Sequence, residues 1–553
     1  MENFTRSGHI IDLTNRRIYP GTIQVNKGKI TSIFEDPTPK DNVYILPGFI
    51  DAHIHIESSM LIPSEFARLA SVHGTVATVS DPHEIGNVLG LAGVRYMIEN
   101  GKQVPFHFNF GAPSCVPATQ FETAGATISW REIQTLLVED KLKYLSEMMN
   151  FPGVLARDPE VMKKIEVAKS LGKPVDGHAP GLRDPQAAAY IAAGISTDHE
   201  CFTLEEALDK LKHGMKILIR EGSAAKNYEA LHTLLKTHPS MVMFCSDDKH
   251  PHELVDGHIN ELVVRSIVEK GYDLMDVLRA ACLNPVVHYG LDVGLLRLQD
   301  QADFIIVNNL KEFHVLETYV KGTLIAKQGK TLIPRLTTAS TPNHFATSAK
   351  TPNDFAIPAK TGKIHVIQAM DGQLISHDLL ADPKISNGNL VPDIKNDILK
   401  LTVVNRYSNA KPAVAFIQNF GLKKGALASC IAHDSHNIIA VGCSDEDICA
   451  AVNLLIKHKG GIAVVNGPES HVLPLPVAGI MTNEDGYVVA QKYADIDKRS
   501  KELGSTLHAP FMTLSFMALL VIPELKLSDK GLFDAKQFKF IPLQTQPEAI
   551  IAR

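Results

Sequence analysis

Residues 46–58, LPGFIDAHIHIES, join an apolar run to two histidines spaced two apart. The apolar part is typical of a buried β-strand. Because successive side chains on a strand alternate faces, His53 and His55 point to the same side. A pair of this kind occurs both as ordinary surface polarity and in metal sites, so its meaning depends on the strands that follow it.

Similar runs recur through residues 48–290. Each apolar or β-prone run ends in polar residues, Gly or Pro, and helix-compatible sequence separates it from the next. The runs are ILPGFIDAHIH, TVATVSDPHE, PFHFNFGAPS, KYLSEMMNFPG, KPVDGHAP, GISTDHE, KILIREGS and MVMFCSDD. Eight strand-helix units in about 240 residues predict an α/β fold with a (β/α)8 barrel, in which the ends of the strands meet at one cavity.

Short alternating segments flank this barrel region on both sides. Residues 1–47 and 291–335 contain RRIYPGTIQVNKGKITSIF and QADFIIVNNLKEFHVLETYVKGTLIAKQGK, which are typical of β-hairpins. We expect both flanks to form one small β-sandwich domain.

Residues 336–362 are rich in Pro, Thr, Ala and Asn and nearly repeat ten residues, as TPNHFATSAK and then TPNDFAIPAK. This period is too short and too polar to predict a core, so we expect a linker or surface insertion that is dispensable for chemistry. Residues 363–553 follow with strand-like runs such as AVAFIQNF and a helical run, DEDICAAVNLLIKHK. They predict a C-terminal α+β domain.

The composition indicates what kind of molecule the protein binds. The 553 residues carry a net charge of −6, with 45% hydrophobic and 21% charged residues, as in globular proteins of several domains. No basic stripe indicates nucleic-acid binding. The longest apolar stretch, FMTLSFMALLVI at 511–522, is shorter than a membrane span, and the first residues lack the apolar core of a signal peptide. We expect a cytoplasmic protein with a small-molecule substrate and reduced cysteines.

Metal-ligand residue types stand at the ends of several predicted barrel strands. They are His53, His55, Glu147, His178, His199 and Asp247. Each has an ordinary explanation when taken singly, such as a helix cap or a hydrogen bond to a loop. Together they fit zinc, manganese or ferrous iron, and they are enough for two ions. The HExxH motif is absent, as is the combined HxE and PCxxC pattern of cytidine deaminases.

These strand ends resemble the metal-dependent amidohydrolase superfamily and, more narrowly, the bacterial adenine deaminase family. The narrower resemblance rests on PGFIDAHIHIESSM, SDPHEIGNV, SEMMNFPGV, DGHAPGL, TDHE, LIREGSAAKN, FCSDDKHP, LPLPVAGIM and APFMTLSFMALLVIPELKLSDKGL. It runs over almost the whole chain, and the ten-residue repeat is the part that departs from it. It implies hydrolytic deamination of adenine to hypoxanthine and ammonia in purine salvage, by a hydroxide held on two divalent metals. Mn²⁺ or Fe²⁺ is favoured, with Zn²⁺ chemically possible.

The resemblance also implies roles for the ligands. Glu147 stands on the strand where many amidohydrolases carry a carboxylated lysine, which implies a bridging ligand or, alternatively, a proton carrier. One metal would take His53, His55 and Asp247, and the other would take His178 and His199. Asp247 would pass a proton from the hydroxide to the departing amine.

Other polar residues would act on the substrate. His83 and Glu84 of SDPHE would face the cavity mouth, and Glu84, or Glu147 if it is not a bridge, would protonate the ring. Arg220 and Ser223 would recognise N3, N7 or N9, although a salt bridge within the loops explains Arg220 equally well. The AHDSHN stretch predicts a polar turn at 433–437, with a lid or accessory metal contribution as the alternative.

Two other function classes stay open at this point. One is another binuclear-metal cyclic amidohydrolase acting on a related purine or pyrimidine, such as a dihydropyrimidinase-like protein, although those usually carry the bridging lysine. The other is a non-catalytic scaffold of the same fold, which would be expected to lack ligands. In each case we expect a homodimer or a higher homo-oligomer.

Overall fold

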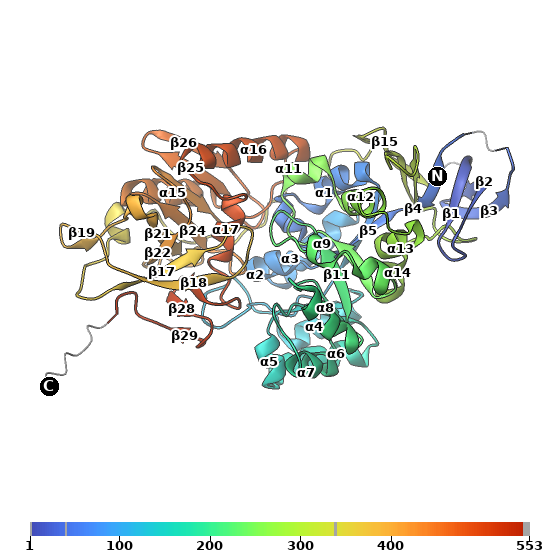
Figure 1. Ribbon diagram of the computed structural model, residues 1–553. Coiled ribbons are helices and arrows are strands. Elements are labelled where there is room, and N and C mark those ends of the chain that lie inside the picture. Colours follow the sequence, from blue (N-terminus) through green and yellow to red (C-terminus); the bar gives the residue numbers. More distant parts are fainter. Residues whose placement is uncertain (1–2, 39–40, 337–339, 546–553) are drawn as a thin grey trace.

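The computed structural model describes residues 3–38, 41–336 and 340–545. Three parts follow one another across the molecule: a small sheet that contains the N-terminus, a central barrel, and a C-terminal domain on the opposite side of the barrel (Figure 1). The predicted α/β class with a barrel at its centre is confirmed.

The barrel is built from parallel strands, and each of the eight predicted runs contains one of them. The strands are β5 (Phe49–Ile54), β6 (Thr75–Ser80), β7 (His107–Phe110), β8 (Leu145–Met148), β9 (Val175–Gly177), β10 (Thr197–Asp198), β11 (Lys216–Arg220) and β12 (Val242–Cys245). Parallel bridges from Ala112 to Leu145 and from Ile54 to Asp247 join β7 to β8 and β12 to β5. The second bridge closes the barrel.

Helices surround these strands, and their starts follow from local sequence. Ser129 and Glu132 form a reciprocal capping box, and Asp158 caps a helix that begins with Pro159. The α-helices are α1 (Pro63–Ala70), α2 (His83–Leu89), α3 (Leu91–Gly101), α4 (Trp130–Val138), α5 (Phe151–Leu155), α6 (Pro159–Ser170), α7 (Gln186–Ala193), α8 (Leu204–Lys212), α9 (Tyr228–Leu231), α10 (Leu234–Thr237), α11 (Pro251–Asp256), α12 (Ile259–Val264), α13 (Leu274–Leu278) and α14 (Asn284–Tyr289). The shorter helical turns are η1 (Ile56–Ser59), η2 (Ser71–His73), η3 (Arg265–Glu269) and η4 (Arg279–Leu283).

The two flanks of the barrel meet in one sheet, where the sequence predicted a β-sandwich. Its order is β16-β15-β14-β13-β4-β1-β2-β3. The strands are β1 (Phe4–Asp12), β2 (Arg17–Asn26), β3 (Lys29–Glu35), β4 (Tyr44–Pro47), β13 (Phe304–Val307), β14 (Val315–Val320), β15 (Thr323–Lys327) and β16 (Lys330–Thr331). Because β4 pairs with β1 on one side and with β13 on the other, it joins the first flank to the second.

The C-terminal domain centres on a second large sheet, of order β18-β17-β22-β21-β24-β23-β25-β26. Its strands are β17 (Ile364–Ala369), β18 (Ser376–Ala381), β21 (Ile398–Val404), β22 (Ala413–Gln418), β23 (Ala426–Ser429), β24 (Ile438–Gly442), β25 (Ile462–Asn466) and β26 (Glu469–Leu473). The helices are α15 (Asp445–His458), α16 (Gly486–Glu502), α17 (Pro510–Phe516), η5 (Pro352–Phe355) and η6 (Ile394–Asn396). Smaller sheets contain β19 (Ile385–Ser386) and β20 (Asn389–Leu390), and β27 (Leu525–Ser528), β28 (Gly531–Asp534) and β29 (Lys539–Phe540).

The structure corrects one expectation about the ten-residue repeat, namely that its residues contribute nothing to a hydrophobic core. Phe355 is fully buried and Phe345 is half-buried, and both pack on the same hydrophobic cluster beneath α15. Each Phe is the fifth residue of its copy, so the period brings two aromatic side chains to one layer. Two hydrogen bonds add to this packing: Ala346 N donates to the backbone oxygen of Arg406 (2.8 Å), and Lys350 N donates to the side-chain Oδ1 of Asn453 (2.8 Å).

The longest apolar stretch of the sequence, 511–522, forms the short helix α17 and the turns after it. Its side chains are largely buried against the rest of the C-terminal domain. Across the ranges that the structure describes, no helix is both long and apolar enough to cross a membrane.

Lys526 on β27 is an unusual buried cation. Its Nζ donates a hydrogen bond to Leu374 O (2.6 Å), and burial alone lowers the pKa of its amine to about 7. In the unfolded chain a lysine keeps a pKa of about 10.4. The unfolded state therefore binds more protons between about pH 7 and pH 10, so this group makes the fold more stable as the pH rises.

We predict that Lys526→Met raises the melting temperature, and raises it more at pH 6 than at pH 9. At pH 6 the native protein must hold a buried charge, whereas at pH 9 the buried amine is neutral. Differential scanning calorimetry of both proteins at the two pH values measures this difference. Lys539→Met, at an exposed position of β29, is the control and should change the melting temperature little at either pH. An equal rise in melting temperature for Lys526→Met at both pH values would contradict the lowered pKa of Lys526.

Candidate active site

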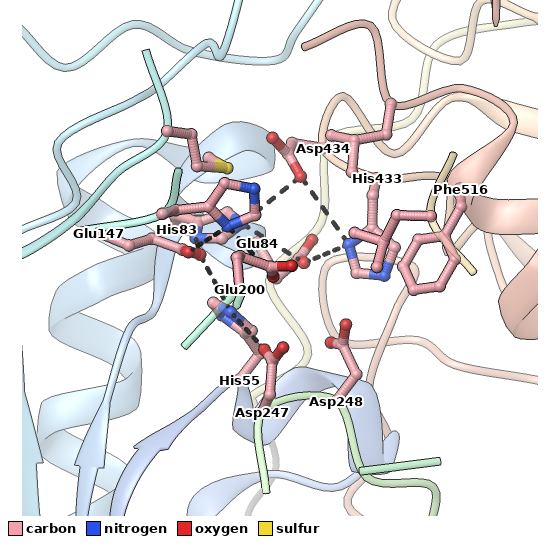
Figure 2. A pocket seen from close by; sticks show the side chains of 14 residues that line it. His55, His83, Glu84, Glu147, Glu200, Asp247, Asp248, His433, Asp434 and Phe516 are labelled. Atoms are coloured by element: carbon pink, nitrogen blue, oxygen red, sulfur yellow. Dashed lines mark hydrogen bonds and ion pairs between the residues drawn. The ribbon is translucent and has the colours of Figure 1, made fainter. Parts of the chain in front are cut away.

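A cavity lies at the carboxyl ends of the barrel strands, where the C-terminal domain faces them (Figure 2). Four of the predicted metal ligands line it, namely His55, Glu147, His178 and Asp247. The other two contact this group directly, because His53 Nε2 lies 3.6 Å from Asp247 Oδ1 and His199 Nε2 lies 3.3 Å from Glu147 Oε2. The structure therefore brings together all six predicted ligands.

Glu147 lies at the centre of the cluster. Its Oε1 is 3.1 Å from His55 Nε2, and its Oε2 is 2.9 Å from His178 Nδ1 and 3.3 Å from His199 Nε2. Burial acts to raise the pKa of Glu147, but the surrounding imidazoles outweigh it and hold that pKa well below its usual range. The two oxygens thus face different histidines, which is the arrangement that a bridging ligand needs.

The barrel closure places Asp247 beside the first histidine pair. Asp247 N donates to His53 O (2.9 Å), and His55 N donates to Asp247 O (3.3 Å). Its side-chain Oδ1 lies 3.6 Å from His53 Nε2 and 3.3 Å from His55 Nε2. Asp247 has a φ of 55°, a left-handed conformation that Asp tolerates better than most residues. The same backbone contacts that close the barrel therefore assemble three ligand side chains.

The donor atoms fit divalent cations. Both ring nitrogens of His53 and the Nε2 of His178 are buried without a hydrogen-bond partner in the described part of the chain. An unpaired buried polar atom costs roughly 1–3 kcal/mol, which coordination to a cation would offset. Several sets of donor atoms lie within 4.8 Å of one another, among them His53, His55 and Asp247; His53, Glu147 and His199; His178, His199 and Glu200; His55, Asp81, His83 and Glu147; and His83, Glu84 and Asp434.

Arg220 is buried and does not line the cavity. Its guanidinium contacts both Glu200 and Asp247, and Nη2 donates to Glu200 Oε2 (3.0 Å). Burial acts to raise the pKa of Asp247, but Arg220 and the neighbouring histidines together outweigh it and keep that pKa well below its usual range. Of the two interpretations that the sequence left open for Arg220, the geometry favours the salt bridge over contact with a substrate.

Ser223 also lies outside the cavity lining. Its Oγ donates to Glu253 Oε2 (2.5 Å) and accepts from His250 N (2.8 Å), so the hydroxyl is occupied within the loop after β11. The geometry therefore favours a structural role for Ser223 over recognition of a ring nitrogen.

His83 and Glu84 do line the cavity, and the C-terminal domain meets them there. Glu84 Oε1 is 2.5 Å from His433 Nδ1, and Oε2 contacts His436. Burial alone would lower the pKa of His433, but the carboxylate of Glu84, together with those of Asp248 and Asp434, outweighs it and raises that pKa to about 9. Of the two interpretations of 433–437, this contact favours a contribution to the barrel mouth over an ordinary polar turn.

Several residues that line this cavity were not among the predicted site residues. Glu200 directly follows His199 in TDHE, and Asp248 directly follows Asp247 in SDDKHP. Their positions next to predicted ligands could therefore have identified them. Asp434, Phe516 and Leu519 come from the C-terminal domain. Asp434 lies in the stretch 433–437, for which a lid was one alternative, whereas nothing in the local sequence of Phe516 and Leu519 indicates that they reach the barrel.

The space left between these side chains is small. The cavity volume is about 20 Å³, which is room for little more than one water molecule. The side chains at the mouth must therefore move to admit a ligand of the size of a heterocyclic base.

Comparison with known proteins gives matches over almost the whole chain. Residues 44–325 match the amidohydrolase family, and residues 373–539 match the adenine deaminase C-terminal domain. An adenine deaminase of Sulfurovum sp. (strain NBC37-1) is 58% identical over 532 residues, covering 96% of this chain and 98% of that protein. Adenine deaminases of Salinibacter ruber and Methanosarcina mazei are 53% and 52% identical, covering 98% and 97% of this chain and 98% of each relative.

We predict that Arg220→Met strongly destabilises the barrel. The change leaves Glu200 and one oxygen of Asp247 buried without their cation, and breaking a buried pair in this way costs about 3–5 kcal/mol. The measurement is the free energy of unfolding in urea after metal has been removed with a chelator.

Arg183→Met is the matched control, because Arg183 Nε pairs with Asp209 Oδ2 at 2.6 Å on the surface, where its side chain is 45% exposed. This pair should contribute no more than about 1 kcal/mol. Equal losses in the two variants would show that the buried pair has no special role.

Proposed function

The chain belongs to the adenine deaminase family of amidohydrolases and hydrolyses adenine to hypoxanthine and ammonia, and we propose that it does so with two divalent cations held by the barrel cluster. His53, His55 and Asp247 would hold one cation, His178 and His199 the other, and Glu147 would bridge them. The observation that carries this proposal is the position of Glu147, whose two oxygens face different histidines.

The reaction sets three requirements. Water must attack C6 of adenine, a ring nitrogen must gain a proton as the ring accepts electrons, and the amino group must gain a proton before it leaves. Bound divalent cations activate water at neutral pH and stabilise negative charge on the attacked ring. The chain's own residues must hold the base in place and move the two protons.

Asp247 is suited to the proton that goes to the leaving amine. Arg220 occupies its Oδ2, so that Oδ1 remains on the side of His53 and His55, at the cavity. A carboxylate held in this way can take a proton from the attacking water and return it to the amino group of the substrate. Its fixed orientation reduces the rearrangement that the transfer requires.

His83 connects the two carboxylates that the sequence offered as carriers of the ring proton. Its Nδ1 is 3.5 Å from Glu147 Oε1, and its Nε2 is 3.5 Å from Glu84 Oε1. Through His83, a proton held by either carboxylate can reach the cavity. We propose that His83 and Glu84 together deliver the proton to the ring.

Some assignments within this function stay predictions. The choice of Mn²⁺ or Fe²⁺ over Zn²⁺ rests on the resemblance to the family, since imidazole and carboxylate ligands suit all three. The homo-oligomeric assembly and the cytoplasmic location rest on the sequence alone.

The test of the function is ammonia release from a panel of purines and pyrimidines. Protein reconstituted separately with Mn²⁺, Fe²⁺ or Zn²⁺ should act on adenine, and elemental analysis should give two ions per chain at full activity. Faster ammonia release from another aminopurine or from an aminopyrimidine such as cytosine would favour the broader amidohydrolase function. So would hydrolysis of a dihydropyrimidine, which opens the ring without releasing ammonia and is followed by the disappearance of the dihydropyrimidine itself. Full activity with one ion would refute the binuclear site.

We predict that Asp247→Asn lowers turnover of adenine by on the order of 100-fold or more, because the amide keeps an oxygen donor but cannot accept the proton. Part of the bound metal should remain. Steady-state ammonia release and elemental analysis on the same samples separate the two effects.

Asp209→Asn, on the surface, is the control and should keep normal activity. His53→Ala and His55→Ala should instead lose metal while the chain stays folded, as measured by circular dichroism. Near-normal turnover by Asp247→Asn would refute its role in proton transfer.

A further inference from the structure

The outer wall of the cavity comes from the C-terminal domain. His433 and Asp434 lie in the turn between β23 and β24, and Phe516 ends α17. Figure 2 shows these side chains across the cavity from Glu147 and His55. The site therefore has two walls. One lies on the barrel and holds the predicted metal ligands, and the second lies on the C-terminal domain and has no role in the mechanism proposed above.

Asp434 presents an unpaired acceptor on this second wall. The residue is 2% exposed, and its Oδ2 has no hydrogen-bond partner among the described residues. Its other oxygen, Oδ1, lies 3.5 Å from His83 Nε2 and 3.8 Å from His433 Nδ1. A buried carboxylate oxygen in this state is costly unless a ligand supplies a donor.

Apolar side chains share the cavity with Asp434. Phe516, Leu519, Leu374 and Met149 line the same cavity, and Phe516 packs on the ring of His433 at 5.5 Å between centroids. Such a wall suits the faces of a flat heterocycle, and the nearby carboxylate suits a donor on its edge.

Adenine carries one such donor away from the reacting carbon. Its five-membered ring has a single N–H, on N9 or N7 according to the tautomer, while C6 must lie at the metal-binding wall. When N9 carries a sugar or an alkyl group, this ring has no N–H in either position. A carboxylate that accepts from this group would therefore distinguish a free base from its N9-substituted forms.

We propose that Asp434 is a specificity-determining residue, which accepts a hydrogen bond from the imidazole N–H of adenine and so selects the free base over nucleosides. This inference rests on the proposed function. The C-terminal domain then supplies part of the substrate site. A base with an N9 substituent cannot donate this hydrogen bond, and its substituent points at the wall that carries Asp434.

The first test compares adenine with 9-methyladenine on the unaltered, metal-loaded enzyme. The methyl group is small but removes the ring N–H. Because a hydrogen bond to a charged group is lost, kcat/KM should fall by on the order of 10- to 100-fold. If adenine is deaminated and 9-methyladenine is equally good, the inference is overturned and the proposed function stands. If adenine releases no ammonia, both fail.

The second test uses Asp434→Asn and Asp434→Ala. Each should lower kcat/KM for adenine, with the larger fall for Ala, while kcat/KM for 9-methyladenine changes little, so that the discrimination between the two compounds shrinks. The number of bound metal ions should not change. Loss of a metal ion would overturn the inference, because it would identify Asp434, with His83 and Glu84, as a ligand set.

Asp529→Asn is the matched control for this comparison. Asp529 lies at the same junction between the domains, where it accepts from Thr123 N (2.9 Å) and Asn405 Nδ2 (2.8 Å), but it does not line the cavity. Its variant should keep the discrimination of the unaltered enzyme. Equal loss of discrimination in Asp529→Asn and Asp434→Asn would assign the effect to the domain junction and overturn the inference.

Discussion

The closure of the barrel between β5 and β12 is the contact on which the site depends. Two backbone hydrogen bonds link Asp247 to His53 and His55, and they set the register of the last strand against the first. Because side chains alternate along a strand, a shift by one residue would turn the histidine pair away from the cavity. One pairing therefore serves both the fold and the ligand geometry.

The charges of the site follow from this closure. Glu147, Glu200 and Asp247 are buried close together, with the guanidinium of Arg220 as the fixed cation among them. Carboxylates repel one another in a medium of low dielectric constant, so their assembly needs positive charge nearby. Arg220 supplies part of it, and divalent cations would supply the remainder. The protein thus combines a permanent counter-charge on one side of the cluster with an exchangeable one on the other.

The sequence predicted the barrel and the gathering of six His, Glu and Asp residues at its strand ends, because both depend on local patterns. Strand alternation orients His53 and His55, and the ends of parallel strands gather His178, His199 and Asp247 at one place. The direction of the Arg220 side chain was beyond such patterns, since its partners are fixed by tertiary packing.

Contacts between distant parts of the chain were equally out of reach. The approach of 433–436 to Glu84 joins segments about 350 positions apart, and no periodicity in the sequence reports it. The burial of Phe355 was missed for a related reason, because a single Phe in each polar ten-residue copy matches neither the helix nor the strand period, and the cluster that it joins is made by distant residues.

The order of strands in the small sheet bears on synthesis of the chain. β4 ends at Pro47, and its partner β13 begins at Phe304, so the whole barrel must leave the ribosome before the pair can form. At roughly 5–20 residues per second, this interval lasts on the order of tens of seconds. During this interval β4 exposes the edge that later pairs with β13, and an unpaired strand edge is the kind of surface that promotes aggregation or chaperone binding. The nascent protein therefore carries this unpaired edge from the synthesis of β4 until the barrel has been made.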